Sequence, residues 1–220
     1  MEPLLALALL AAIGKRSSPS SSATSSAPCS SPPSPANELP SSWTFPYPVL
    51  TPELAERFNV RPEPLITDGP GAGKRRSRDG SPRWHEGVDL FYQRRSPVER
   101  PDDGGSRRFV TPPGTPVLAP AAGRVWSARR TARGWRVVLD HGRPWASVLT
   151  HLDELVGIPV VDAANRNTIS VEAGQVLGTA GADPLDPQGL VHLHYELHRE
   201  GRWVDPTAAM RRWRRVPYPA

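Results

Sequence analysis

Short runs of strand-forming residues, each closed by glycine or proline, dominate the second half of this 220-residue chain and constrain its fold more than any other feature. No amphipathic pattern long enough for a helix of three turns stands between them. Many short strands separated by turn signals are typical of an antiparallel, all-β domain. We therefore predict strands over residues 115–119, 123–128, 135–140, 146–152, 175–178 and 191–198.

The beginning of the chain has a different composition. Proline is common, with 27 residues, and the prolines and serines concentrate before residue 50. Residues 17–42, mostly Ser, Pro and Ala, bury too little apolar surface to offset chain entropy, so we expect a disordered linker. The apolar stretch at residues 4–13 is shorter than the roughly 20 residues that span a bilayer. Two interpretations stay open for residues 1–16: a signal or anchor that associates weakly with a membrane, or a plain hydrophobic terminus.

Three further segments complete the expected domain organisation. Residues 43–82 carry aromatic side chains, among them Trp43 and Phe45, which we expect to pack on the domain as an arm followed by a loop. The folded domain is predicted over residues 83–210. Residues 211–220 are expected to form a basic C-terminal tail.

The formal net charge of +5 implies attraction to an anionic partner: nucleic acid, a membrane surface or a cell-wall polymer. The basic residues are dispersed and no nucleic-acid-binding module is recognisable, so we expect no nucleic acid partner. The single cysteine, Cys29, excludes an internal disulfide and a zinc site made of cysteines.

Two histidines one residue apart, His192 and His194, are the first candidates for a metal site. Because side chains alternate faces along a strand, both imidazoles should point the same way, with Cα atoms about 6.5 to 7 Å apart. Leu193 and Tyr195 should then face the core. His198 shares the parity of the pair but lies about 13 Å from His194 along the strand, so we interpret it as a bystander.

His85 and Asp89 form a second candidate pair. Their spacing is similar to that of the zincin motif His-Glu-x-x-His, in which a helix presents two ligands. Gly87 within the motif and Pro82 before it disfavour a helix. We therefore expect an extended strand or a turn to present both side chains.

Five side chains have the chemistry of a catalytic zinc site: His85, Asp89, His151, His192 and His194. A catalytic zinc needs three protein ligands and one open position for water. Two groups remain, which is the number that a hydrolytic site uses for proton transfer and for transition-state support. This surplus favours an enzyme over a structural zinc site. A sixth histidine at position 141 follows a predicted strand and is interpreted as a hydrogen-bonded turn residue.

A series of short motifs follows one order along the chain. The motifs are His-x-Gly-x-Asp from His85, Gly-Thr-Pro-Val-x-Ala-Pro-Ala-x-Gly-x-Val from Gly114, His-Gly from His141, Thr-His-Leu from Thr150, Gly-Gln-Val-Leu-Gly from Gly174, and His-Leu-His-Tyr-Glu-Leu from His192. In this order they resemble the motifs of the lysostaphin-type, LytM-like zinc metallopeptidases, which cut peptide bridges of bacterial peptidoglycan; the resemblance spans roughly 120 residues.

The resemblance implies a two-layer antiparallel β-sheet domain with Zn²⁺ in a groove. It makes His85, Asp89 and His194 the zinc ligands. His192 would take the proton of the metal-bound water, and His151 would orient or hydrogen-bond the developing oxyanion. A non-catalytic relative that binds cell wall or activates another hydrolase is the alternative.

The same resemblance implies peptidoglycan peptide stems or crosslinks as the substrate of a monomeric protein. The expected location is the cell envelope or the extracellular space, with a phage particle as a further location. Residues 91–113, 157–170 and 181–189 look like insertions relative to the family, and these loops would shape the substrate groove.

Overall fold

The computed structural model describes residues 39–68, 75–76, 82–83, 85–99, 101–186 and 188–219. The predictions made for residues 1–16, for Cys29 and for most of the 17–42 segment lie outside the described residues. None of the described helices is long and apolar enough to cross a membrane.

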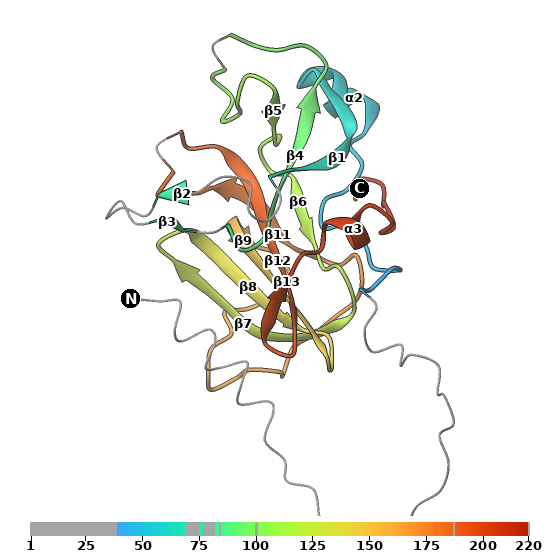
Figure 1. The fold of residues 1–220 in the computed structure, drawn as a ribbon, viewed down its shortest axis with the longest axis vertical. Coiled ribbons are helices and arrows are strands. Elements are labelled where there is room, and N and C mark those ends of the chain that lie inside the picture. The colour runs from blue at the N-terminus through green and yellow to red at the C-terminus, as the bar shows by residue number, and fades with distance from the viewer. Residues whose placement is uncertain are drawn as a thin grey trace, which may run out of the picture.

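Strands dominate the described residues. They are β1 (Val60–Asp68), β2 (Arg75–Arg76), β3 (Pro82–Arg83), β4 (Val88–Arg94), β5 (Phe109–Val110), β6 (Pro116–Leu118), β7 (Gly123–Thr131), β8 (Gly134–Asp140), β9 (Trp145–Leu155), β10 (Ser170–Val171), β11 (Val176–Ala182), β12 (Val191–Arg199) and β13 (Arg202–Val204). Two short helices, α2 (Pro52–Arg57) and α3 (Thr207–Met210), lie outside the sheet (Figure 1). Helix α2 begins at Thr51, whose hydroxyl accepts the backbone N–H of Leu54.

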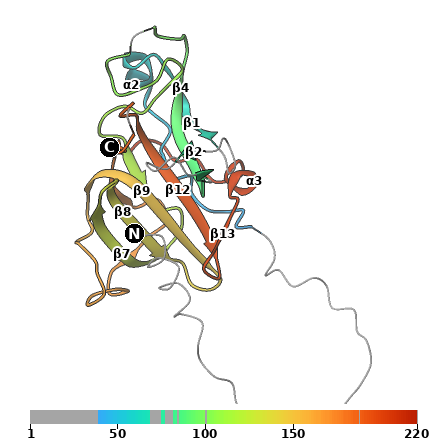
Figure 2. The ribbon, with the colours of Figure 1, turned by 60° about the vertical axis from the view of Figure 1, so that its left-hand side comes forward.

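All of these strands except β2 and β3 form one large curled sheet in the order β1-β4-β12-β11-β9-β8-β7-β10, with β5, β6 and β13 added at its sides. Strands β2 and β3 pair in a separate two-stranded sheet. All the named strand pairs are antiparallel. Strand β12 pairs with β4 along one edge and with β9 along the other, so it joins the two halves of the sheet (Figure 2). The predicted all-β, two-layer antiparallel fold is confirmed.

Each of the six strand segments predicted from the sequence overlaps an observed strand, although β6 is shorter than the predicted 115–119 and β11 begins one residue later than predicted. The structure extends three of them: β7 continues to Thr131, β9 to Leu155 and β11 to Ala182. Strands β7 and β8 form a hairpin whose pairing continues to Thr131 and Gly134, so hydrogen bonds carry the strand past the last apolar residue. Pairing partners, which a single sequence does not reveal, set these ends.

The core is built from the inward-facing side chains of β4, β12 and the β7–β9 sheet. Leu193, Tyr195 and Leu197 alternate along β12 and have no exposed surface, as the strand parity predicts. Tyr92 on β4 is equally buried and donates its hydroxyl to the carbonyl of Pro48 at 2.7 Å. The buried side chains of β12 and β4 therefore fix the positions of the polar side chains on the same two strands.

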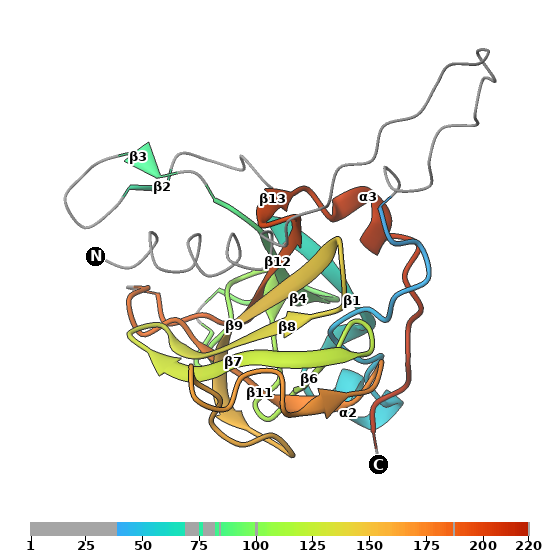
Figure 3. The same ribbon diagram turned by 90° about the horizontal axis from the view of Figure 1, so that it is seen from below.

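Both segments that flank the predicted domain supply core side chains. Phe45 and Tyr47 have no exposed surface, and Trp213 donates its indole N–H to the carbonyl of Pro40 at 2.6 Å. The two segments run side by side, with parallel bridges that include Thr44 and Arg214 (Figure 3). The boundaries at residues 83 and 210 stay a prediction, but the side chains on either side of them pack in one core.

Replacement of Phe45 by alanine should destabilise the whole domain, because the side chain is fully buried in the shared core. The cavity left behind typically costs about 3–5 kcal/mol of unfolding free energy. Urea unfolding followed by tryptophan fluorescence measures the loss. Val160→Ala, at a side chain that is 54% exposed, is the control and should change stability by less than about 0.5 kcal/mol. An unchanged Phe45→Ala variant would mean that the arm is not part of the folding unit.

Candidate metal centre

Pairing between β4 and β12 builds the centre of the site. Their register sets Asp89 directly opposite His194. Directly opposed residues of an antiparallel pair have Cβ atoms about 4.5–5.5 Å apart, so the two polar groups meet without any long side chain. His192 lies two residues earlier on β12, on the same face as His194, which confirms the parity expected for the pair.

Gly87 lets the segment before β4 approach β12 closely. Its φ is +136°, a conformation that favours glycine, and a Cβ at this position would lie 2.7 Å from Cε1 and Nε2 of His194. The backbone at His85 and Asp89 is not helical: Asp89 lies in β4 and His85 in the extended segment before it. The zincin alternative therefore does not apply, and the extended presentation predicted for the pair is confirmed.

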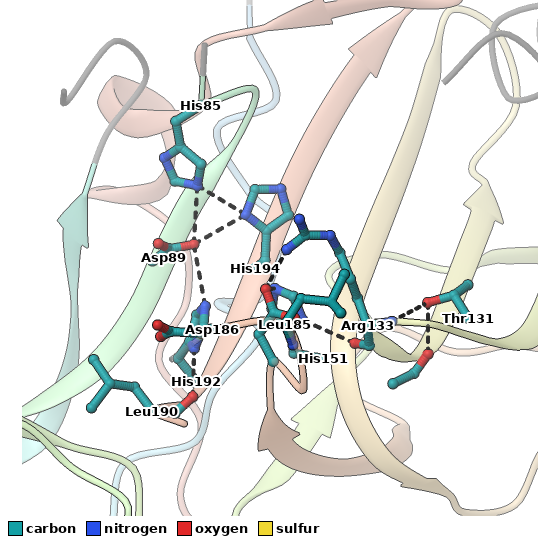
Figure 4. A network of polar contacts seen from close by, with 12 residues as sticks. His85, Asp89, Thr131, Arg133, His151, Leu185, Asp186, Leu190, His192 and His194 are labelled. Carbon is teal, nitrogen blue, oxygen red and sulfur yellow. Dashed lines mark hydrogen bonds and ion pairs between the residues drawn. The ribbon is translucent and has the colours of Figure 1, made fainter. Parts of the chain in front are cut away.

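Three candidate ligand atoms converge at this point (Figure 4). Nε2 of His85 lies 3.1 Å from Oδ1 of Asp89 and 3.0 Å from Nδ1 of His194, and Nδ1 of His194 lies 3.0 Å from Oδ1 of Asp89. Tetrahedral zinc with bonds of about 2.0–2.2 Å separates its ligand atoms by roughly 3.3 Å. Two imidazole nitrogens and one carboxylate oxygen at this spacing fit such an ion.

The carboxylate of Asp89 sits in a strongly positive surrounding. Burial alone would raise its pKa, but hydrogen bonds from His194 and His85 hold the pKa well below its usual range. Burial alone would lower the pKa of His194, but Asp89 and Glu196 together raise it to about 9. Asp89 is therefore an anion at neutral pH, which is the form that binds a cation.

Two residues behind His194 fix the orientation of its ring. Nε2 of His194 lies 3.4 Å from Oε1 of Glu196, and the other oxygen of Glu196 lies 2.7 Å from Nε2 of His198. A carboxylate that accepts the second N–H of a ligating imidazole keeps the ligand atom aimed at the metal. His198 lies outside the three-ligand cluster, as expected, but it is buried and contacts Glu196.

A β-bulge aims His151 at the site. Trp135 pairs with Leu152 and Arg136 with Thr150, so His151 is the extra residue on β9. Its φ is +69°, which is uncommon for a residue with a side chain. Bulges re-aim side chains next to active sites, and the energetic cost of the conformation points to a functional constraint.

The rings of His151 and His192 lie next to each other beside the three-ligand cluster, with centroids 4.7 Å apart and an interplanar angle of 48°. Each ring is held by a backbone carbonyl: Nδ1 of His151 lies 3.0 Å from the oxygen of Arg133, and Nδ1 of His192 lies 2.9 Å from that of Leu190. A carbonyl only accepts, so both Nδ1 atoms carry the proton of the neutral ring. Both Nε2 atoms are then free to accept a proton, and Nε2 of His192 lies 3.7 Å from Oδ1 of Asp89.

Sequence reasoning missed two charged residues next to His151. Arg133, in the turn between β7 and β8, forms an ion pair with the buried carboxylate of Asp183, which lies 3.9 Å from Nε2 of His151. Burial, together with the charges of His192 and His194, lowers the pKa of His151 to about 3. Because Arg133 neutralises Asp183, His151 stays an uncharged base. Fifty residues separate this pair in the sequence, and no local pattern links them.

The sixth histidine lies away from the cluster. His141 contacts the carbonyl of Ala122 at 2.9 Å and the hydroxyl of Ser147 at 2.7 Å, and packs on the ring of Trp43. This agrees with its interpretation as a turn residue. Tyr92 on β4 and Tyr195 on β12 are fully buried core residues.

Comparisons with known proteins find similar metallopeptidases. Residues 106–206 match the model of peptidase family M23, a range that contains His151, His192 and His194 but begins after His85 and Asp89. An uncharacterized metalloprotease of Haemophilus influenzae is 36% identical over 118 residues, which are 51% of this chain and 22% of the relative. The chain thus spans about a fifth of the length of that relative.

Two solved structures are similar in fold. A zinc-containing peptidase from Vibrio cholerae is 24% identical, with a TM-score of 0.47 over 78% of this chain and 41% of the other. Lysostaphin from Staphylococcus simulans is 19% identical, with a TM-score of 0.47 over 76% of this chain and 55% of the other. The resemblance to lysostaphin-type metallopeptidases that the sequence predicts is thus supported by the match of residues 106–206 to peptidase family M23.

Proposed function

We propose that this protein is a zinc-dependent endopeptidase that hydrolyses peptide crosslinks of bacterial peptidoglycan. The observation that carries the proposal is the pair His151 and His192, which face the three-ligand cluster without belonging to it. A structural metal site needs neither group. Two neutral imidazoles beside an open metal position are instead what hydrolysis of an amide uses.

His85, Asp89 and His194 would hold the zinc, and the side chains around them divide the remaining work. A bound zinc polarises a carbonyl oxygen and lowers the pKa of a coordinated water toward about 7. His192 presents a lone pair on Nε2 and is the general base that takes the proton of the attacking water. The carbonyl of Leu190 fixes this tautomer.

His151 supports the same step from the other side. As a neutral ring whose Nδ1 proton is held by the carbonyl of Arg133, it first accepts a hydrogen bond through Nε2. It becomes a donor to the developing oxyanion, or to the leaving amine, once it has received a proton. The two imidazoles therefore act as a relay for one proton, with His192 nearer to Asp89.

The proposed substrate implies a cellular location. Peptidoglycan lies outside the cytoplasmic membrane, so we propose a location in the cell envelope or outside the cell. The net charge of +5 favours adsorption to an anionic wall. A monomer suffices, because every side chain named in the site comes from one chain.

Metal content tests the ligand assignment. Asp89→Ala and His194→Ala should each lose most of the zinc, because two remaining ligands bind far more weakly than three. The wild type should hold about one zinc per chain by elemental analysis. His141→Ala is the matched control, since it removes a histidine outside the cluster. Full zinc retention in both ligand variants would contradict the assignment.

The pH dependence of metal binding tests the same cluster. The raised pKa of His194, about 9, means that the chelator-treated protein carries a proton on this ring at neutral pH. The proton must leave before Nδ1 binds a metal, so zinc affinity should rise about tenfold per pH unit until pH 9. Competition with a chromogenic chelator between pH 6 and 9 measures the slope. A flat profile would place the metal elsewhere.

Two further variants separate hydrolysis from wall binding. His151→Ala and His192→Ala should keep their zinc but lose on the order of a hundred- to ten-thousand-fold in rate. The assay is release of soluble peptide from purified peptidoglycan of glycyl-bridged and of diaminopimelate types, with zinc measured in each sample. A zinc-loaded wild type that binds both walls and releases nothing would favour the non-catalytic alternative.

A further inference from the structure

Two adjoining cavities lead away from the metal centre on the side of His192. The first, of about 230 Å³, is lined in part by Asp89 and His192. The second, of about 580 Å³, is lined in part by Arg107 and Arg108. Three residues line both cavities: Ser106, Phe109 and Leu190. A groove therefore continues from the candidate ligands to a pair of arginines.

Aromatic side chains run along this groove. The ring of Phe91 stacks on His192, with centroids 5.2 Å apart and an interplanar angle of 11°. The ring centroid of Phe109, which lines both cavities, lies 6.2 Å from that of Phe91. A substrate segment that leaves the reacting bond in this direction meets an apolar surface before it reaches the charges.

The loop that carries the arginines is held in one conformation. Arg94, a buried residue of β4, pairs with Asp103 at 2.6 Å and donates Nε to the carbonyl of Ser106 at 3.0 Å. The backbone N–H of Val191, next to His192, donates to the carbonyl of Gly104 at 2.9 Å. The loop is therefore fixed to the same strand as the site, and the cavity is formed before any ligand arrives.

The charge of the far cavity is not balanced within the described residues. Arg107 and Arg108 are exposed, and their side chains make no hydrogen bond or ion pair with any described residue. No described acidic residue lines the second cavity; the first is lined by Asp89 and by Asp186, which accepts the backbone N–H of Gln188. Two adjacent cations at the end of a groove favour an anion, and a guanidinium pairs with a carboxylate in bidentate geometry.

We infer that this second cavity is a subsite for a free carboxylate of the peptide stem, held by Arg107 and Arg108. The inference rests on the proposed function and names the substrate feature that the groove selects. Phe91 and Phe109 contact the uncharged part of the segment, and the arginines contact its carboxylate. The subsite therefore discriminates stems with free carboxylates from amidated stems.

Binding of two matched ligands tests the subsite without requiring turnover. The probes are soluble crosslinked muropeptides, released from purified walls by a muramidase, either with free carboxylates or after chemical amidation. Calorimetry with the zinc-loaded, full-length His151→Ala variant prevents cleavage during the measurement. The free form should bind about three- to tenfold more tightly, since each exposed ion pair contributes modestly. The difference should shrink at high salt.

Replacing both arginines tests whether Arg107 and Arg108 bind the carboxylate. Arg107→Gln combined with Arg108→Gln should bring the affinity ratio close to one. The control is Arg211→Gln with Arg212→Gln, an adjacent exposed pair outside the groove, which should leave the ratio unchanged. Thermal unfolding should be alike in both double variants, because all four side chains are exposed.

The outcomes separate the two proposals. Equal affinity for both muropeptides, a ratio that survives the loss of Arg107 and Arg108, or no binding of either probe would overturn the subsite. A wild type that shows the predicted ratio but releases no peptide from walls would overturn the endopeptidase and keep the subsite. A wild type that cleaves both forms with equal KM would overturn the subsite and keep the endopeptidase.

Discussion

The hydrogen-bonded register of β12 is the constraint on which the rest of the structure depends. This one strand pairs with β4 through Asp89 and His194 and with β9 through Thr150 and His194. A slip of one residue would turn both histidines of β12 into the core and expose Leu193 and Tyr195. The buried residues of β12 thus specify the register, and the register places the polar groups. Packing on one face of the sheet determines the chemistry on the other.

Much of the fold and of the site could be predicted because it depends on local rules. The two-residue period of a strand gives the common face of His192 and His194, and glycine at position 87 is a local sign against a helix. Both follow from the sequence alone. The five candidate residues also meet in space, because they lie on or next to β4, β9 and β12, and β12 pairs with both of the other strands.

The features that could not be predicted depend on contacts between distant residues. The bulge at His151 arises from the offset between β8 and β9, which no sequence period reveals. The ion pair of Arg133 and Asp183 joins a turn to the end of another strand. The link from His198 through Glu196 to His194 is likewise hidden in the sequence, because distance along one strand does not show which side chains meet. In each case the missing information is a pairing rather than a propensity.

The pairing of the two flanking segments has a consequence for how the protein is made. Thr44 and Arg214 are bridged across 170 residues, and Trp213 completes a core that Phe45 begins. Contacts so far apart form late, because 170 residues must leave the ribosome between one partner and the other. His194 likewise follows Asp89 by 105 residues. A nascent chain that has not yet reached Trp213 and Arg214 holds no closed core, so the metal centre and the finished fold should appear together.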